Sequence, residues 1–273
     1  MRLNLPASAI FLLGSTLSPA ALVSHPGEHE FESYVGSLEA RLARQHSSPD
    51  TYLALISLEG ALRSDAERKL VAGAIRIEPV NGGSWQVNGG LLHHWRAVEF
   101  VPDASLKDML ALLQGHNDLS RYYSPEVVSS RALADNGAMT TIAMRLKKER
   151  VITVVLDAEF QVESGLAGSG RGYSFSRSTH IWQIDQPGTP RERRLAEGAD
   201  NGFLWRLNSY WSFEQRSNGL FIECEAVSLT RRVPTGLGWL IMPIVGTLPR
   251  DSLQFTLTAT KNALALNTIK QTH

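Results

Sequence analysis

Residues 221–234, FIECEAVSLTRRVP, have the pattern of a β-strand that ends at the start of an apolar, proline-containing connection. Successive side chains of a strand point to opposite faces of its sheet. One face therefore carries the small row Ile222, Cys224, Ala226 and Ser228, and the other carries Phe221, Glu223, Glu225, Val227 and Leu229. The alternation predicts a strand but leaves open which of the two faces lies against a helix.

The segment that follows this strand is apolar and uncharged from Gly236 to Leu248. The longer stretch Arg231–Leu253 contains three prolines and three glycines, and we expect them to prevent a continuous helix, which excludes a membrane-spanning segment. We expect a connection that leads into a final helix at Pro249–Leu266, in which Leu257 lies on the apolar face. Trp239 and Ile241 would be costly to expose, so they are predicted to form an apolar lid or a tip that touches a membrane transiently. Packing of these side chains under the N-terminal helices is the alternative.

The region upstream alternates between short strands and turns rather than between strands and helices. A strand at Leu91–Val101 is followed by a helical pattern at Ser105–Tyr123, which begins with a capping residue and an acidic residue three positions later. Further strands are predicted at Val127–Ala134, Met139–Lys147, Val151–Glu163, Tyr173–Ile184, Gly202–Phe213 and Leu220–Arg231. Short turns between strands, with helices at the two ends, indicate an α+β fold with a curved antiparallel sheet around a long C-terminal helix.

The N-terminal third has a different character. Residues 1–24 contain one early arginine, an apolar run and small residues at cleavage-like spacing, which predicts a signal peptide and a periplasmic or secreted protein. Residues 25–89 contain two helical patterns followed by a strand-like stretch at Val71–Trp85, and as a whole they are predicted to be a helical N-terminal extension. The main domain is placed at residues 90–267.

Composition limits the possible partners. The 273 residues include 27 basic and 27 acidic side chains, and a balanced charge argues against a nucleic-acid partner. The single cysteine excludes an internal disulfide framework, and the histidine spacing gives no support for a metal site. His93 and His94 are adjacent in a strand, so they point to opposite faces and cannot chelate one ion together. We expect no metal, no cofactor and no assignable catalytic residue.

The element order and three segments carry a family resemblance. These are the strand at Leu91–Val101, the segment LKDMLALLQGHNDLSRYYSPEV that begins at Leu106, and FIECEAVSLTRRVP before the apolar connection. Over Gly90–Leu266 the chain resembles the START-like, or SRPBCC, helix-grip superfamily, which includes polyketide cyclases, coenzyme-Q-binding proteins and lipid-transfer domains. The resemblance implies an apolar cavity between the sheet and the final helix, but it implies no universal catalytic residue.

Polar and aromatic side chains on the last two strands are the candidate ligand contacts. If Gly202–Phe213 pairs with Leu220–Arg231, a glutamate can face Arg206 across the sheet beside Tyr210, either as a solvated ion pair or as a polar anchor inside the cavity. Cys224 is more readily a small core residue than a nucleophile. The predicted ligand-binding residues are Trp205, Arg206, Tyr210, Trp211, Cys224, Glu225, Trp239, Ile241 and Leu257.

Three functions remain open at this level. The first is binding or transport of a hydrophobic small molecule or lipid in the internal cavity, by apolar burial with one or two polar groups for orientation. The second is a cyclase- or lyase-type enzyme that uses acid–base residues in the same cavity. The third is a structural or interaction protein whose N-terminal helices cover the cavity.

Overall fold

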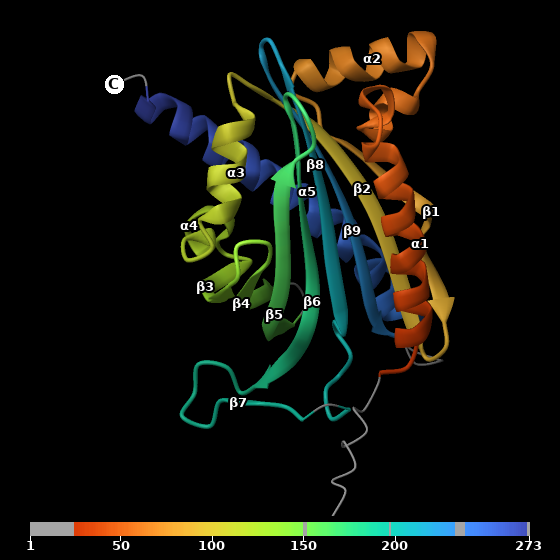
Figure 1. Ribbon diagram of the computed structural model, residues 1–273. Helices are drawn as coiled ribbons and strands as arrows, with labels where there is room; N and C mark the ends of the chain where they lie inside the picture. Colours follow the sequence, from red (N-terminus) through yellow and green to blue (C-terminus); the bar gives the residue numbers. More distant parts are fainter. Residues whose placement is uncertain (1–24, 150–151, 197, 233–237, 272–273) are drawn as a thin grey trace, which may run out of the picture.

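The computed structural model describes residues 25–149, 152–196, 198–232 and 238–271 of the chain (Figure 1). For residues 56–57, 238–246 and 267–271 the structure describes the backbone but not the side chains. The expected signal peptide at residues 1–24 lies outside the described residues. Among the helices that are described, none has both the length and the apolarity needed to cross a membrane.

A nine-stranded antiparallel sheet forms the framework. Eight strands follow the order β1-β2-β9-β8-β6-β5-β4-β3, and the short β7 pairs with β6 beside this path. The strand bounds are β1 Arg76–Val87, β2 Gly90–Pro102, β3 Val127–Asp135, β4 Thr140–Glu149, β5 Thr153–Leu166, β6 Arg171–Asp185, β7 Arg193–Arg194, β8 Arg206–Arg216 and β9 Gly219–Arg231. Pairing of β2 with β9, the last strand of the chain, brings segments more than a hundred residues apart into one surface.

The long C-terminal helix α5 (Gly238–Gln271) covers one face of the sheet, which we call the inner face. Figure 1 shows α5 crossing the sheet on the side opposite α1. Two shorter helices, α3 (Leu106–Gln114) and α4 (Leu119–Tyr123), complete this layer. Leu253, Leu257 and Leu264 of α5 are 4%, 0% and 0% exposed, and they pack in one cluster with inner-face strand residues. This arrangement of a long helix held by a sheet confirms the predicted α+β helix-grip fold.

The opposite, outer face is covered by N-terminal elements. Helix α1 (Glu28–His46) buries Phe31, Val35, Leu38 and Leu42 against Leu92, Tyr210, Val227 and Leu229 of the sheet. Helix α2 (Gly60–Val71) and the 3-10 turns at Pro49–Thr51 and Ala54–Ser57 continue this layer. A fully buried Phe or Leu side chain contributes roughly 1.5–3 kcal/mol, so the apolar stripe of α1 is enough to hold it on the sheet.

Three helices differ from the sequence-based expectation. The helical pattern over Ser105–Tyr123 is divided at Gly115, which ends α3 before α4 begins. The pattern over Tyr52–Arg68 becomes a helix only at Gly60, after the two 3-10 turns. The expectation that prolines prevent a continuous helix before Pro249 is wrong, because α5 begins at Gly238 and includes Pro243 and Pro249. A proline removes one backbone hydrogen bond, which a helix can tolerate as a local kink.

The two free edges of the sheet are irregular. β1 lies in the region predicted to be a helical extension, yet it pairs with β2 and forms one edge of the sheet, with a register shift between Pro79 and Ser84. β3 forms the other edge and has two register shifts against β4, between Val127 and Ser129 and between Ala132 and Ala134. Both edge strands therefore contain bulges, which twist a strand locally and leave a residue unpaired.

Candidate functional site

Glu99 is the most unusual group on the inner face. It lies on β2 between Ala97 and Val101, whose side chains belong to the cluster around α5. The alternation of the strand therefore directs Glu99 toward α5. Its side chain is 0% exposed, and neither carboxyl oxygen has a hydrogen-bond partner among the described residues. A buried polar group without a partner costs about 1–3 kcal/mol. Glu99 therefore lowers the stability of the folded chain as long as no other molecule binds its carboxyl.

The environment of Glu99 favours its neutral form. Burial raises the pKa of this carboxyl to about 8, against the smaller opposing effect of the positive charge on Lys261 of α5. The protonated acid is therefore the dominant form at neutral pH. In that form the group has one O–H donor and one carbonyl acceptor in an apolar interior.

Two hydroxyl groups that bind each other lie within electrostatic reach of this acid. The hydroxyl groups of Tyr123 on α4 and Thr260 on α5 are 2.9 Å apart and buried. Burial raises the pKa of the Tyr123 phenol well above its usual value, and a negative charge on Cys224 or Glu99 would raise it further, which places these groups within electrostatic reach of one another. The tyrosine therefore stays protonated and can exchange hydrogen bonds with a nearby polar group.

Apolar side chains surround these polar groups. They come from α3, α5 and the inner face of the strands, and they include Ala97, Val101, Met109, Leu112, Ile142, Phe160, Trp211, Phe213, Ile222, Leu253, Leu257 and Leu264. Several of the remaining contacts are small, among them Cys224, Ala259 and Ala263. Burial raises the pKa of the Cys224 thiol well above its usual value, so this cysteine is a neutral core residue and a poor nucleophile.

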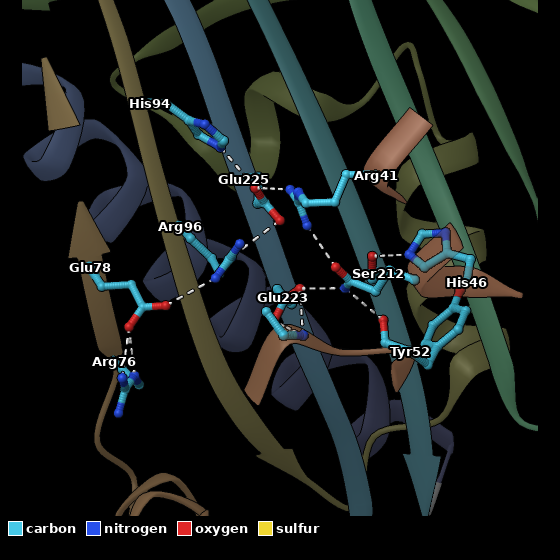
Figure 2. Close-up of polar contacts among 12 residues, drawn as sticks. Arg41, His46, Tyr52, Arg76, Glu78, His94, Arg96, Ser212, Glu223 and Glu225 are labelled. Carbon is cyan, nitrogen blue, oxygen red and sulfur yellow. Dashed lines mark hydrogen bonds and ion pairs between the residues drawn. The ribbon is translucent and has the colours of Figure 1, made fainter. Parts of the chain in front are cut away.

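The outer face buries two further glutamates, and Figure 2 shows their surroundings. Glu225 is 1% exposed and is bound by three basic side chains from two elements. Its Oε2 accepts hydrogen bonds from Arg41 of α1 at 2.6 Å and His94 of β2 at 2.8 Å, and its Oε1 lies 3.2 Å from Nε of Arg96. Burial alone would raise the pKa of this carboxyl, but the His94 hydrogen bond and the charges of Arg96 and Arg41 hold it well below its usual range.

The contacts of His94 follow from the charge of Glu225. A carboxylate only accepts hydrogen bonds, so Nε2 of His94 carries the proton and Nδ1 is free to accept. Nδ1 lies 2.6 Å from the hydroxyl of Tyr34 on α1. Burial lowers the pKa of this histidine, which keeps the ring neutral. The chain Tyr34–His94–Glu225 therefore ties α1 to the sheet.

Glu223 is bound in a different way. Its two carboxyl oxygens accept the backbone N–H of Ala54 at 3.1 and 2.9 Å, and Gln45 donates to Oε1 at 3.3 Å. Burial raises the pKa of Glu223 to about 7, with a lowering contribution from Arg96 and a raising one from Glu225. This carboxyl therefore fixes the turn that follows α1 against the sheet.

The predicted ligand contacts divide between the two faces. Strands β8 and β9 pair as expected, with Tyr210 opposite Glu225 and Trp211 opposite Cys224. Trp211, Cys224 and Leu257 lie in the inner-face cluster. Four residues lie on the outer side near α1: Trp205, Arg206, Tyr210 and Glu225. The side chains of Trp239 and Ile241 lie outside those that the structure describes.

The outer-side candidates already have partners. Arg206 binds Glu28 and Glu32 of α1, and Tyr210 donates to Glu39 at 2.9 Å. Trp205 donates to Asp200 at 2.9 Å. The predicted polar ladder of Arg206 with a sheet glutamate does not form, because Arg206 pairs with α1 while Glu225 pairs with Arg41, Arg96 and His94.

The sequence-based selection missed Glu99 and Tyr123. The signal for Glu99 was a single acidic residue in the apolar strand LLHHWRAVEFV, on the same parity as Ala97 and Val101. No comparable signal marks Tyr123, because its partner Thr260 is 137 residues away. Within the described ranges, no group of three or more His, Cys, Asp or Glu side chains could hold a metal ion. His93 and His94 bind different partners, Ser84 and Thr230 for the first and Tyr34 and Glu225 for the second.

One cleft opens on the surface rather than between the sheet and α5. It has a volume of about 450 Å³ and lies between α4 and the β3–β4 edge. Its lining consists of Ser120, Arg121, Ser124, Pro125, Val127, Val128 and Lys147. Glu99, Tyr123 and Thr260 are not among these residues, so the buried polar groups and this cleft are separate features.

Comparisons with known proteins give matches among solved structures only. No family model and no curated protein sequence matches the chain. Solved structures do match. A STAR-related lipid transfer protein fragment from Xanthomonas axonopodis is 16% identical, with 67% of this chain and 99% of that one covered and a TM-score of 0.44. Human STARD10 is 9% identical, with 79% and 84% covered and a TM-score of 0.43. Both TM-scores lie below 0.5, so the helix-grip fold rests on the sheet and α5 of this chain and not on these matches.

A third similar structure is an enzyme. The Zhui aromatase/cyclase from a Streptomyces species is 9% identical, with 67% of this chain and 96% of that one covered and a TM-score of 0.43. Proteins named for lipid transfer and for cyclisation therefore match this chain with nearly equal scores. At these identities and TM-scores, the matches do not indicate the function of this chain.

Proposed function

We propose that the protein binds a hydrophobic small molecule or lipid between the inner face of the sheet and α5. The observation that carries this proposal is Glu99, a fully buried carboxyl for which no described residue is a hydrogen-bond partner, on the face that α5 covers. A group of this kind weakens the folded state unless something satisfies it. A bound molecule with an apolar body and one polar group would do so.

The surroundings of Glu99 suit such a ligand. Apolar side chains of the inner face can replace water around the ligand body, which contributes about 25 cal/mol per Å² of apolar surface removed from water. Leu257 and Leu264 lie against the sheet in this structure, so ligand entry requires α5 to move outward and to exchange these contacts for contacts with the ligand. Trp211 and Cys224, predicted from the sequence, would then line the ligand body.

The test is to fill the inner face. Ala263 of α5 is 2% exposed, and Ala265 on the same helix is exposed. Ala263→Trp should lower binding of the neutral hydrophobic dye Nile red by at least about tenfold, whereas the matched control Ala265→Trp should leave it unchanged. Native mass spectrometry of the wild-type protein should also show co-purified hydrophobic molecules.

Two results would reject the proposal. One is a wild-type protein that binds neither Nile red nor any extractable hydrophobic molecule. The other is equal loss of binding in both tryptophan variants while both stay folded by circular dichroism. Because a buried tryptophan can prevent folding, the smaller substitution Ala263→Leu serves as a second filling variant, which should also lower binding of Nile red but by a smaller factor.

A second candidate function is a cyclase- or lyase-type enzyme in the same interior. The specific observation in its favour is again Glu99, since an acid whose pKa is raised to about 8 by burial is suited to donate a proton near neutral pH. Chemical conversion of a bound molecule, abolished by Glu99→Gln without loss of binding, would establish the enzyme. Unchanged recovery of every bound compound would favour the binding protein.

We also propose that residues 1–24 direct export, as the sequence predicts. The N-terminal residue of the mature protein, determined after expression in a bacterium with a periplasm, tests this. A new terminus near residue 25 in the periplasmic fraction supports export, and an intact Met1 in the cytosolic fraction opposes it.

A further inference from the structure

Strands β2 and β9 bury three glutamates, and one of them, Glu99, has no hydrogen-bond partner in the part of the chain that the structure describes. Glu223 and Glu225 of β9 are hydrogen-bonded to the N-terminal elements on the outer face. Glu99 of β2 lies opposite Ile222 of β9, on the inner face. Both of its carboxyl oxygens lack a hydrogen bond among the described residues. The same sheet therefore satisfies its outer carboxyls and leaves the inner one available.

The groups around Glu99 define the kind of polar end that fits. The hydroxyl pair of Tyr123 and Thr260 is uncharged. Among the described residues, Lys261 of α5 is the charged side chain that acts on the Glu99 carboxyl, and it is partly exposed. No carboxylate partner or second cation is therefore available in the described interior to neutralise a charged ligand.

We infer that Glu99 binds the hydroxyl or carbonyl group of an uncharged hydrophobic ligand and so makes the interior selective for such molecules. This inference rests on the proposed binding function and names its ligand class. The neutral acid can donate its O–H to a carbonyl or hydroxyl oxygen, and its own carbonyl can accept a ligand O–H. Tyr123 or Thr260 can supply a further hydrogen bond by exchanging their mutual contact.

Other classes of hydrophobic molecule fit less well. A pure hydrocarbon leaves Glu99 unsatisfied and so loses the contribution of that hydrogen bond. A fatty carboxylate adds a negative charge to an apolar region that has no buried cation, which is costly. An amine requires both its own charge and that of Glu99 in the interior, where desolvation opposes a buried ion pair.

A set of probes with one chain length separates these classes. Decanol, decanone, decane, decanoate and decylamine compete with Nile red for the wild-type protein in mildly acidic buffer, in which Glu99 is protonated. Decanol and decanone should bind roughly tenfold more tightly than decane, as expected for one buried hydrogen bond. Decanoate and decylamine should be weaker than decanol by at least the same factor.

Variants assign the selectivity to Glu99. Glu99→Leu should remove the preference for decanol over decane, while decane binding stays within about twofold or improves. Glu99→Gln keeps a donor and an acceptor at the same place, so it should keep much of the preference. The control is Glu223→Gln on the outer face, which should change neither the affinity for decane nor the preference for decanol.

The outcomes separate this inference from the function beneath it. If no probe binds the wild-type protein, the binding function itself fails. If decane and decanol bind equally well, or if Glu99→Leu keeps the preference for decanol, ligand binding stands and the role of Glu99 is overturned. Tightest binding by decylamine would overturn the uncharged class, because it would show an ionised Glu99 that pairs with a cation.

Discussion

The two faces of the sheet bury acidic side chains under opposite conditions. On the outer face, Glu225 has ion pairs with Arg41 and Arg96 and a hydrogen bond from His94, and its pKa is held low. On the inner face, Glu99 has none of these contacts, and burial raises its pKa to about 8. Strands β2 and β9 carry both environments, because alternate residues of one strand face different layers.

This difference separates two uses of a buried carboxyl. A paired carboxylate at the contact between a helix and a sheet fixes where the helix lies, and the cost of its burial is offset by its partners. An unpaired acid does not stabilise the folded chain, and its O–H donor and carbonyl acceptor are available to bind another molecule. The outer network is therefore structural, and the inner acid is the better candidate for function.

Removal of the outer carboxylate should have the largest effect. Glu225→Leu leaves Arg41, Arg96 and the ring of His94 without their shared acceptor, and Arg96 is only 17% exposed. Loss of one partner of a buried ion pair typically costs about 3–5 kcal/mol. The free energy of unfolding in urea measures this, with Glu149→Gln as the control at the exposed pair with Lys147, which should cost less than about 1 kcal/mol. Equal effects of the two substitutions would contradict a structural role for the outer network.

Replacement of the inner acid should have the opposite sign. Glu99→Leu removes an unsatisfied carboxyl and puts an apolar side chain of similar size in an apolar cluster. We expect the unfolding free energy in mildly acidic urea solutions to increase by about 1–3 kcal/mol. A decrease of similar size would mean that Glu99 stabilises the fold, and the contrast between the faces would fail.

The pH dependence of stability should show whether Glu99 is protonated or ionised in the folded protein. The pKa of Glu99 is about 8 in the folded protein and close to its ordinary value of 4.5 in the unfolded chain. Between these values the unfolded state loses its proton first, so stability falls as pH rises, by at most about 1.4 kcal/mol per pH unit. The difference in unfolding free energy between wild type and Glu99→Leu should grow from pH 4.5 to about 8 and then level off. Glu223 also has a raised pKa, but it is present in both proteins, so its contribution cancels in this difference. A constant difference would show that Glu99 is ionised in the folded protein.

The smallest effect is expected at the rim of the outer layer. Arg206 is 20% exposed and binds Glu28 and the half-exposed Glu32 of α1. Ion pairs of this kind contribute less than about 1 kcal/mol, so Arg206→Gln should lower the unfolding free energy only slightly. Loss of more than about 2 kcal/mol in the same urea assay would show that the rim, and not Glu225, holds α1 on the sheet.

The sequence predicts more of the fold than of the site, for a physical reason. Strand alternation depends only on neighbouring residues, so the two faces of β9 were assigned correctly from their pattern. The partners across layers depend on tertiary packing: Arg41 and Glu225 are 184 residues apart, and nothing local indicates that α1 covers the outer face. Glu99 was missed because an acid in a strand is usually solvated, and its burial follows from α5. The prolines of α5 misled for a related reason, since tertiary contacts can outweigh a lost backbone hydrogen bond.

The irregular edges of the sheet affect how the molecule meets its own copies. The eight neighbouring strands form an open sheet, so each of its two edge strands has a row of backbone N–H and C=O groups without a partner strand. Such rows are templates to which another strand can add. The bulges in β1 and β3 interrupt the regular spacing of these groups at both ends of the strand order. A strand from a second chain could pair with only part of either edge, so the protein has built-in resistance to edge-to-edge aggregation at high concentration.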